Sequence, residues 1–337
     1  MKHAGIVKKS DFITWLASRE AVITSERLIR RHKELVSSVS AMEVRNVKET
    51  VFPGFGTLFS YRWEDRRWII EDIPVTAKKC TVLVHPCEAT ALNEVLDRVF
   101  MNGEHPERDY EKLRSSLELV TIACEEPEST CFCRMVGGDP FRRVPDTLFV
   151  VPLEDRLYVE CEEPNVWELW KKCVKVPSEV EKEIAEKEKK SREALPDPPL
   201  SEEVPEQLYR LFEDEEWDNI AWKCLNCGAC TYLCPTCYCF DIHADGRLKG
   251  YQLRSWDACM FPRFTLHASG HNPRPGYRER VRQRVLHKFS YFPMREEGRF
   301  GCVGCGACVE VCPVNWDIRE AVQRMVKKSG AGYARSS

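Results

Sequence analysis

Residues 11–35 carry the hydrophobic periodicity of a helix. Phe12, Trp15, Leu16, Ala21 and Val22 recur on one helical face, so we expect helix across residues 11–35. A second helical pattern follows Pro86 and Cys87 in the stretch EATALNEVLDRVF.

Short apolar runs bounded by polar and turn-forming residues predict strands in the same half of the chain. These runs lie at residues 66–73, 81–86, 117–124, 147–152 and 156–161. Strands interleaved with helices indicate an α/β domain, which we place at residues 1–177.

The pattern changes after this domain. Residues 178–205 begin as a highly charged stretch, which predicts a solvated helix, and end as a Pro-rich, extended stretch. We expect this segment to link the first domain to a second one at residues 206–337. The second domain opens with an amphipathic helical pattern at residues 206–222.

Cysteine usage suggests metal chemistry. The chain has 18 cysteines, seven before residue 201 and eleven after residue 200. The N-terminus lacks the apolar region of a secretory signal, and no apolar run reaches the roughly 18 residues of a membrane span. We therefore expect a cytoplasmic chain, in which cysteines bind metal more often than they form disulfides. The net charge of −3 does not indicate a nucleic-acid partner.

Two cysteine motifs with the same spacing follow in the second domain. Each reads C-x2-C-x2-C-x3-C-P, the pattern of ferredoxins that hold two 4Fe-4S clusters. In that pattern the fourth cysteine of each motif ligates the cluster of the other motif. We therefore expect a first tetrad of Cys224, Cys227, Cys230 and Cys312. The second tetrad is then Cys302, Cys305, Cys308 and Cys234.

The motif spacing favours iron–sulfur clusters over zinc. Zinc also binds four thiolates, but its sites are typically built from two separated C-x2-C pairs. Gly228, Gly304 and Gly306 let the backbone pass close to inorganic sulfur. These features predict a mostly helical, ferredoxin-like second domain, so the chain as a whole is α+β or α/β.

The two motifs are separated by a long insert, residues 235–301. This insert has to fold so that the two motif loops stay adjacent. After the second motif, a helical face is formed by Ile318, Ala321, Val322, Met325 and Val326. This helix either covers the second cluster or docks a partner.

A third tetrad is predicted in the first domain. Cys87 lies where a strand turns into a helix N-terminus, Cys124 ends a strand, and Cys131 and Cys133 form a C-x-C pair. Cysteines at strand ends and in an adjoining loop converge at one edge of a sheet. We expect either a third 4Fe-4S cluster or buried structural cysteines here.

Cys237, Cys239 and Cys259 exceed what the two motifs require. These three extra cysteines could form a further metal site with a non-cysteine ligand, play a structural role, or donate hydrogen bonds to cluster sulfur. Candidate fourth ligands are Asp241, His243, His267 and His271.

Residues 274–288 contain five arginines and one lysine against one glutamate. Positive charges beside a 4Fe-4S cluster offset its negative charge and raise its reduction potential, and they can also dock a partner. A Gly-x-Gly at residues 54–56 lacks the continuation of a nucleotide-binding loop. Flavin and nucleotide are therefore expected on a partner chain.

The sequence resembles the iron–sulfur beta subunit of cytoplasmic nickel–iron sulfhydrogenases and the A subunit of anaerobic sulfite reductase. The resemblance lies in CPTCYCFD, RSWDACMFPRF, HASGHNPRP and the second motif. It is looser in HPCEATALNEVLDRVF and CFCRMVGGDP, where His85 and Glu88 stand in place of Arg and Asp.

This resemblance implies an electron-transfer subunit of a multi-subunit oxidoreductase, without an independent active site. Its partners would be a flavin and NAD(P)-binding reductase subunit and a catalytic subunit, either a nickel–iron hydrogenase or a siroheme sulfite reductase. Two other functions stay open: a catalytic subunit of a sulfur- or disulfide-reducing complex, and a zinc-dependent binding module.

Overall fold

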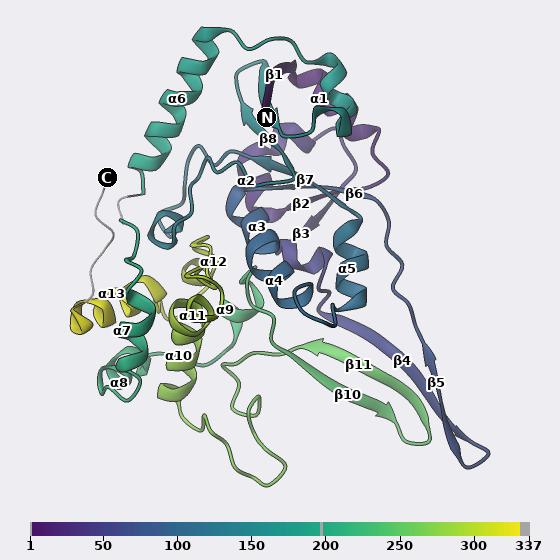
Figure 1. The fold of residues 1–337 in the computed structure, drawn as a ribbon, viewed down its shortest axis with the longest axis vertical. Helices are drawn as coiled ribbons and strands as arrows, with labels where there is room; N and C mark the ends of the chain where they lie inside the picture. The colour runs from purple at the N-terminus through teal and green to yellow at the C-terminus, as the bar shows by residue number, and fades with distance from the viewer. Residues whose placement is uncertain (1, 196–197, 331–337) are drawn as a thin grey trace. The chain divides into compact units, whose positions relative to one another are not determined.

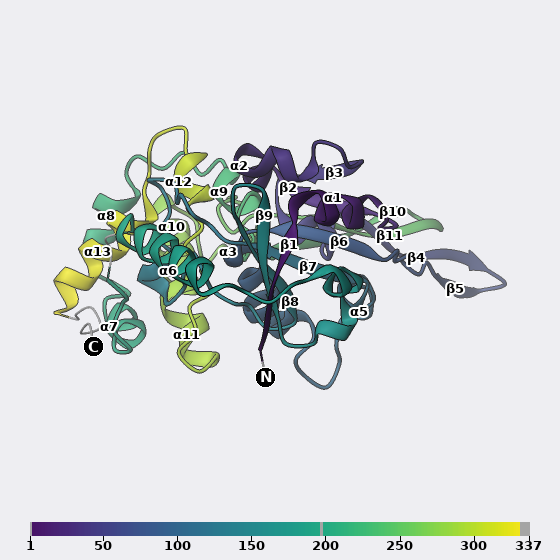
Figure 2. The same ribbon diagram turned by 90° about the horizontal axis from the view of Figure 1, so that it is seen from above.

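The computed structural model describes residues 2–195 and 198–330, which form two compact units (Figures 1 and 2). The first unit comprises the described parts of Met1–Val51, Thr76–Asp197 and Val303–Cys305. The second unit comprises those of Phe52–Val75, Pro198–Cys302 and Gly306–Ser337. Within the described ranges, no helix is long and apolar enough to cross a membrane.

The first unit contains a seven-stranded sheet in the order β1-β9-β8-β7-β6-β2-β3. The strands are β1 (His3–Lys8), β2 (Val22–Ser25), β3 (Ala41–Val44), β6 (Cys80–Val84), β7 (Leu117–Ile122), β8 (Thr147–Pro152) and β9 (Arg156–Cys161). The five strands from β8 to β3 are parallel, and β9 and β1 add antiparallel pairs at one edge. The predicted strands after residue 80 are therefore confirmed.

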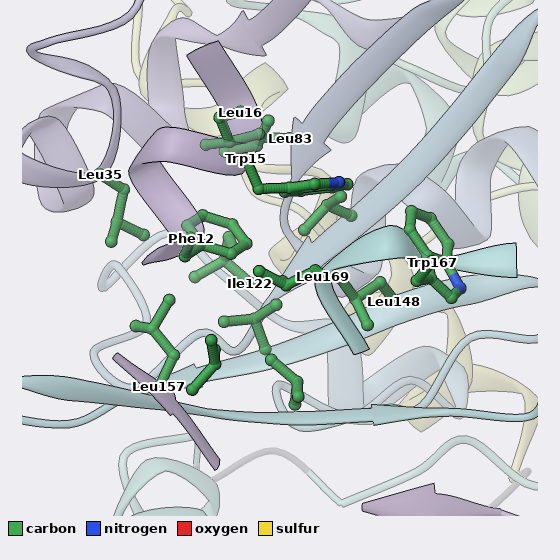
Figure 3. Packing of buried hydrophobic residues seen from close by; sticks show 14 of the residues in the cluster. Phe12, Trp15, Leu16, Leu35, Leu83, Ile122, Leu148, Leu157, Trp167 and Leu169 are labelled. Carbon is green, nitrogen blue, oxygen red and sulfur yellow. The ribbon is translucent and has the colours of Figure 1, made fainter. Parts of the chain in front are cut away.

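Both faces of this sheet are covered. Along β8, Leu148 and Val150 pack into a core with Phe12 and Leu16, whereas Phe149 and Val151 pack into a second cluster (Figure 3). A strand buried on both faces is apolar throughout, and every residue of β8 is buried.

The helices of the first unit connect or cover these strands. They are α1 (Lys9–Ala17), α2 (Glu26–Val36), α3 (Pro86–Thr90), α4 (Asp97–Phe100), α5 (Arg108–Ser115) and α6 (Ser178–Glu193). Residues Ala91–Leu96 continue α3 into α4 as a π-helical segment, so the helix expected at residues 88–100 is present.

The single helix expected across residues 11–35 is wrong. Helix α1 ends at Ala17, strand β2 follows, and helix α2 starts at Glu26. The β-branched residues Val22, Ile23 and Thr24 favour a strand, and all three are buried between β6 and β3. Ser25 then starts α2, because its side chain accepts a hydrogen bond from the Leu28 amide.

Part of the charged segment that was expected to link two domains forms helix α6. The helix is present, but Val180 and Ile184 are buried against Phe141, Phe149 and Val151 of the first unit. Two apolar residues one turn apart are enough to anchor an otherwise charged helix.

The second unit contains a four-stranded antiparallel sheet in the order β10-β11-β4-β5. Its strands are β4 (Phe55–Glu64), β5 (Arg67–Asp72), β10 (Phe240–Gly246) and β11 (Lys249–Trp256). The strand predicted at residues 66–73 is β5, and it pairs with β4 rather than with the sheet of the first unit. Figures 1 and 2 show both hairpin turns pointing away from the helices of the same unit.

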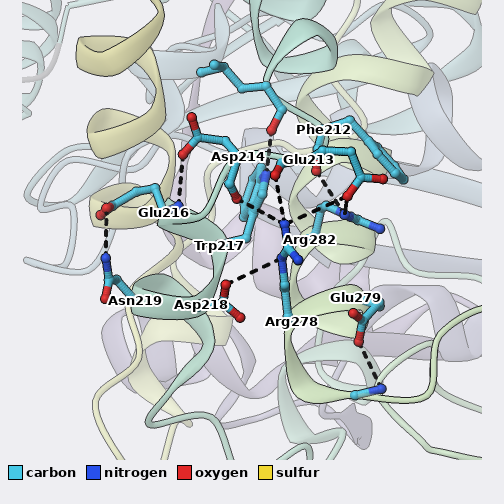
Figure 4. A network of polar contacts seen from close by, with 12 residues as sticks. Phe212, Glu213, Asp214, Glu216, Trp217, Asp218, Asn219, Arg278, Glu279 and Arg282 are labelled. Atoms are coloured by element: carbon cyan, nitrogen blue, oxygen red, sulfur yellow. Dashed lines mark hydrogen bonds and ion pairs between the residues drawn. The ribbon is translucent and has the colours of Figure 1, made fainter.

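Short helices make up the rest of the second unit. They are α7 (Val204–Arg210), α8 (Glu216–Ala221), α9 (Ala229–Tyr232), α10 (Tyr277–Leu286), α11 (Phe292–Arg295), α12 (Ala307–Glu310) and α13 (Ile318–Ser329). The expected helix at residues 206–222 is broken: α7 ends at Arg210 and α8 starts at Glu216, whose amide donates to Asp214 (Figure 4). The five apolar residues predicted to share one face of α13 are all buried, and α13 packs against α7 and α10.

The anchoring of α6 can be tested by truncating one buried residue. Replacing Ile184 with Ala should lower the free energy of unfolding by about 2–4 kcal/mol, because it leaves a cavity under the helix. Replacing the exposed Lys182 with Ala should change it by less than about 0.5 kcal/mol. Denaturant unfolding of the full chain measures both values, and equal small effects would contradict the packing of α6.

Candidate iron–sulfur site

The two cysteine motifs share one local backbone conformation. Gly228 and Gly306 have φ of 77° and 79°, and each directly precedes a four-residue helix, α9 or α12. Asn226 and Gly304 stand at equivalent positions, and both have positive φ, 52° and 63°. Positive φ suits Gly and Asn, so the sequence repeat becomes a structural repeat.

The first tetrad surrounds one cavity of the second unit. All four of its cysteines line this cavity, which holds about 460 Å³ of space not filled by atoms, part of it open to solvent. Cys308, Met260, Val281 and Trp316 line the same cavity. The geometry therefore brings together thiols from both motifs, as the crossed ligand pattern requires.

Two backbone amides point at sulfur atoms of the first tetrad. The Trp316 amide lies 3.1 Å from Cys312 Sγ, and the Asn226 amide lies 3.5 Å from Cys224 Sγ. Amide hydrogen bonds to cysteine sulfur stabilise negative charge on it and raise the reduction potential of a cluster bound there.

Arg284 of α10 points its charge at this cavity. It is 2% exposed, and none of its three guanidinium nitrogens has a hydrogen-bond partner among the described protein atoms. Burial alone would lower the pKa of Arg284, but the nearby thiolates, Cys230 and Cys308 foremost, raise it well above its ordinary value. A buried guanidinium without a protein partner fits an anionic group in the cavity, such as a cluster held by four thiolates.

Lys288 joins the two ends of the insert. Its Nζ donates to Thr236 Oγ1 at 2.7 Å and to the Gly301 carbonyl at 2.9 Å. Thr236 also donates to Gly301, and its Oγ1 lies 3.2 Å from Cys234 Sγ. These bonds hold the end of the first motif next to Gly301, the residue before Cys302.

The extra cysteines pair with neighbouring thiols. Cys237 donates a hydrogen bond to Cys234, which holds the pKa of Cys234 well below its ordinary value and raises the pKa of Cys237. A hydrogen bond with Cys239 likewise raises the pKa of Cys259. Cys237 is therefore placed to donate to a sulfur of the second tetrad.

The candidate fourth ligands for the extra cysteines form contacts with one another. His243 pairs with Asp241 at 3.3 Å on β10, and the His267 amide donates to the His271 carbonyl in a turn. Across the described ranges, no three or more Cys, His, Asp or Glu side chains are arranged to hold a single metal ion. A further metal site at the extra cysteines stays a prediction.

The second tetrad is divided between the two units. Cys234, Cys302 and Cys308 belong to the second unit, and Cys305 belongs to the first. The Phe132 amide donates to the Gly304 carbonyl at 2.8 Å, which attaches this part of the motif to the first unit. Coordination by these four cysteines stays a prediction.

All four cysteines of the third tetrad lie in the first unit, and Cys131 interacts with each of the other three. The charge of Cys131 acts on Cys87, Cys124 and Cys133, so the structure brings the four thiols into one neighbourhood. Burial raises the pKa of Cys124 and of Cys133 to about 12, and it raises the pKa of Cys87 well above its ordinary value. Buried thiols of this kind ionise when a metal coordinates them.

Arg27 of α2 was not singled out by the sequence patterns. Its guanidinium donates to the Cys305 carbonyl and lies 3.4 Å from Cys131 Sγ. Burial opposes its charge, but the thiolates of Cys305, Cys87 and Cys131 raise the pKa of Arg27 above its ordinary value. No motif surrounds Arg27 in the sequence. It lies beside the C-x-C pair because α2, the helix that carries it, starts where β2 ends.

His85 and Glu88 support the start of α3, the helix that carries Cys87. Glu88 accepts hydrogen bonds from Ser25 Oγ at 2.9 Å and from the His85 amide at 3.0 Å. Burial lowers the pKa of His85 to about 3, so its neutral ring donates from Nδ1 to the Ile122 carbonyl at 3.2 Å. These bonds connect the ends of β2, β6 and β7, where the third tetrad begins.

Comparisons with known proteins identify the domain at residues 223–316 and the family of the chain. Residues 223–316 match the 4Fe-4S dicluster domain family. Sulfhydrogenase 2 subunit beta from Pyrococcus furiosus is 33% identical over 237 residues, covering 68% of this chain and 69% of the relative. The chain belongs to the sulfhydrogenase beta-subunit family. It is accordingly an iron–sulfur electron-transfer protein with two 4Fe-4S clusters in its dicluster domain.

The positive charge of Arg284 should raise the reduction potential of the bound clusters. A unit charge several ångströms away contributes about 2 kcal/mol at an effective dielectric constant of 20. Replacing Arg284 with Met should therefore lower a midpoint potential by on the order of 100 mV, as measured by an EPR-monitored redox titration.

Arg282 provides the matched control for this substitution. It is also buried on α10, but it donates to the Phe212 carbonyl and Glu213 (Figure 4). Arg282→Met should leave the potentials within about 20 mV, since its charge is paired elsewhere. Equal shifts in both variants would show that the effect is structural.

The pairing of Cys237 leads to a second prediction. Replacing Cys237 with Ser should leave the iron content unchanged, because the hydroxyl still donates to Cys234. Replacing Cys234 with Ser should remove about four irons per chain, because it takes away an expected ligand. Iron and acid-labile sulfide assays measure both, and a loss of about four irons in Cys237→Ser would assign Cys237 as a ligand.

Proposed function

We propose that this chain relays single electrons within a multi-subunit oxidoreductase. The observation that carries the proposal is the cavity lined by the whole first tetrad, with the buried Arg284 beside it. A bound 4Fe-4S cluster supplies one-electron transfer. The chain's own residues hold it by thiolates, direct amides at their sulfurs, and place a positive charge nearby.

We further propose that the third tetrad binds a cluster of its own. The proposal is supported by four thiols in one neighbourhood of the first unit and by the half-buried Arg27, whose guanidinium approaches Cys131 Sγ. The first unit is then an α/β domain with one cluster. The second is a ferredoxin-like dicluster domain with a long insert, and it uses Cys237 as a hydrogen-bond donor.

The proposed partners are a flavin subunit that exchanges electrons with NAD(P) and a nickel–iron hydrogenase catalytic subunit. The name of the Pyrococcus relative, a sulfhydrogenase subunit, supports the hydrogenase over a siroheme sulfite reductase. The chain itself is proposed to have no independent active site.

Iron and sulfide counts test the cluster assignment. Protein purified without oxygen should contain about twelve irons and twelve sulfides per chain if the third tetrad holds a cluster, and about eight if it does not. Cys131→Ser should lower the count from about twelve to about eight. Cys173→Ser is the matched control, because the Cys173 thiol contacts the Leu169 carbonyl in the first unit.

Two outcomes would contradict the proposal. Colourless protein containing zinc and no iron would support a zinc-dependent binding module instead. Reduction of sulfur or a disulfide by the isolated chain with an artificial electron donor would support a catalytic subunit. Co-purification of a hydrogenase subunit, as opposed to a siroheme subunit, decides between the two proposed complexes.

A further inference from the structure

Two consecutive residues of the second motif, Gly304 and Cys305, lie against the C-x-C loop. The Phe132 amide donates to the Gly304 carbonyl at 2.8 Å, and Cys131 Sγ lies 3.6 Å from the Cys305 carbonyl oxygen. All four of these residues belong to the first unit. The backbone of Cys305, an expected ligand of the second cluster, is therefore in contact with Cys131, an expected ligand of the third.

Arg27 completes this contact from helix α2. Through different nitrogens, its guanidinium donates to the Cys305 carbonyl and lies 3.4 Å from Cys131 Sγ. A guanidinium holds several donors in one plane, so it binds a carbonyl and a sulfur atom at the same time. Arg27, Cys131 and Cys305 thus contact one another pairwise, and we call this arrangement the shared contact.

The thiolate of Cys305 also acts on residues of the third tetrad. Burial raises the pKa of Cys87 well above its ordinary value, and the charge of Cys305 is the next largest cause. Burial opposes the charge of Arg27, and the Cys305 thiolate is the largest of the effects that raise the pKa of Arg27. Cys305 therefore interacts with the third tetrad at Cys87 as well as at Cys131.

Arg31, one turn further along α2, has different surroundings. It pairs with Glu128 at 2.6 Å, and its charge acts on Cys124 of the third tetrad. Arg31 is therefore a cation beside the third tetrad that already has a carboxylate partner, whereas Arg27 binds residues of two cysteine sets.

We propose that the shared contact carries electrons directly between the third and the second cluster. One electron is lost at one tetrad and gained at the other, so one site is oxidised and the other reduced by one electron. No bond breaks, and no proton has to move. This inference rests on the proposed function, which assigns a cluster to the third tetrad.

The geometry of the shared contact suits this transfer. Electron tunnelling weakens steeply with the length of any gap between bonded atoms. The path from Cys131 Sγ to Cys305 Sγ has a through-space step of 3.6 Å to the Cys305 carbonyl and then follows the covalent bonds of Cys305 itself. The charge of Arg27 stabilises the reduced form at both tetrads, so it raises both reduction potentials in the same direction.

The test is an EPR-monitored redox titration of the full chain, purified without oxygen. Arg27→Met should lower the reduced-to-oxidised ratio of two clusters at least tenfold at a given potential, which is about 59 mV for a one-electron couple. Arg27→Lys keeps the charge and should change either ratio by less than about threefold. Arg31→Met is the matched control, and it should lower this ratio for one cluster at most.

A second variant separates contact from charge. Cys124→Ser should remove the third cluster, with a loss of about four irons per chain, and it leaves Arg27, Cys131 and Cys305 in place. The reduced wild-type chain should show a magnetic interaction in its EPR spectrum that is absent from this variant. Adding Arg27→Met to Cys124→Ser should still lower the ratio of one remaining cluster about tenfold.

Two results would overturn the inference. They are a changed ratio for only one cluster in Arg27→Met, and EPR signals of the remaining clusters that are the same with and without the third. Iron and sulfide are counted in the same preparations. Either result with about twelve irons per chain would refute only this inference, whereas about eight irons in the wild type would refute the third cluster of the proposed function.

Discussion

Much of the second unit depends on the bonds that Lys288 makes. The insert between the motifs spans residues 235–301, and ferredoxin-type ligation requires its two ends to meet. Lys288 binds Thr236 at one end and Gly301 at the other, while being only 4% exposed itself. Because the donor comes from inside the insert, the folded insert itself holds the ends of the two motifs together.

This arrangement explains why a basic stretch lies in the interior. Arg280, Arg282, Arg284 and Lys288 are all buried. Burying a cation costs several kcal/mol unless it is paired. Arg280 donates to Asn226, and Arg282 to Phe212 and Glu213, whereas Arg284 is left facing the thiols. Arg280 and Arg284 thus contact the protein's own cysteine loops, and their burial leaves them unsuited to binding nucleic-acid phosphates.

The sequence predicts those parts of the site that depend on neighbours along the chain. The motif spacing anticipates that thiols from Cys224 to Cys312 share one cavity, and short apolar runs anticipate the central strands. The role of Arg27 depends on where β2 ends in the sheet, which no local pattern encodes. The pairing of β4 with β11 joins residues nearly two hundred positions apart, so an N-terminal strand was expected in the wrong sheet.

The two motifs differ at several equivalent positions, and at one of them, Asn226 and Gly304, the difference has a physical cause. Asn226 and Gly304 both adopt positive φ, which either residue tolerates. At Gly304, however, a Cβ would come within 2.5 Å of the backbone of Cys133. Glycine is needed there because the C-x-C loop lies directly against it, not because of the turn alone. The second motif therefore meets two demands at once: the conformation of a cluster-binding loop, and close packing against the loop that carries the third tetrad.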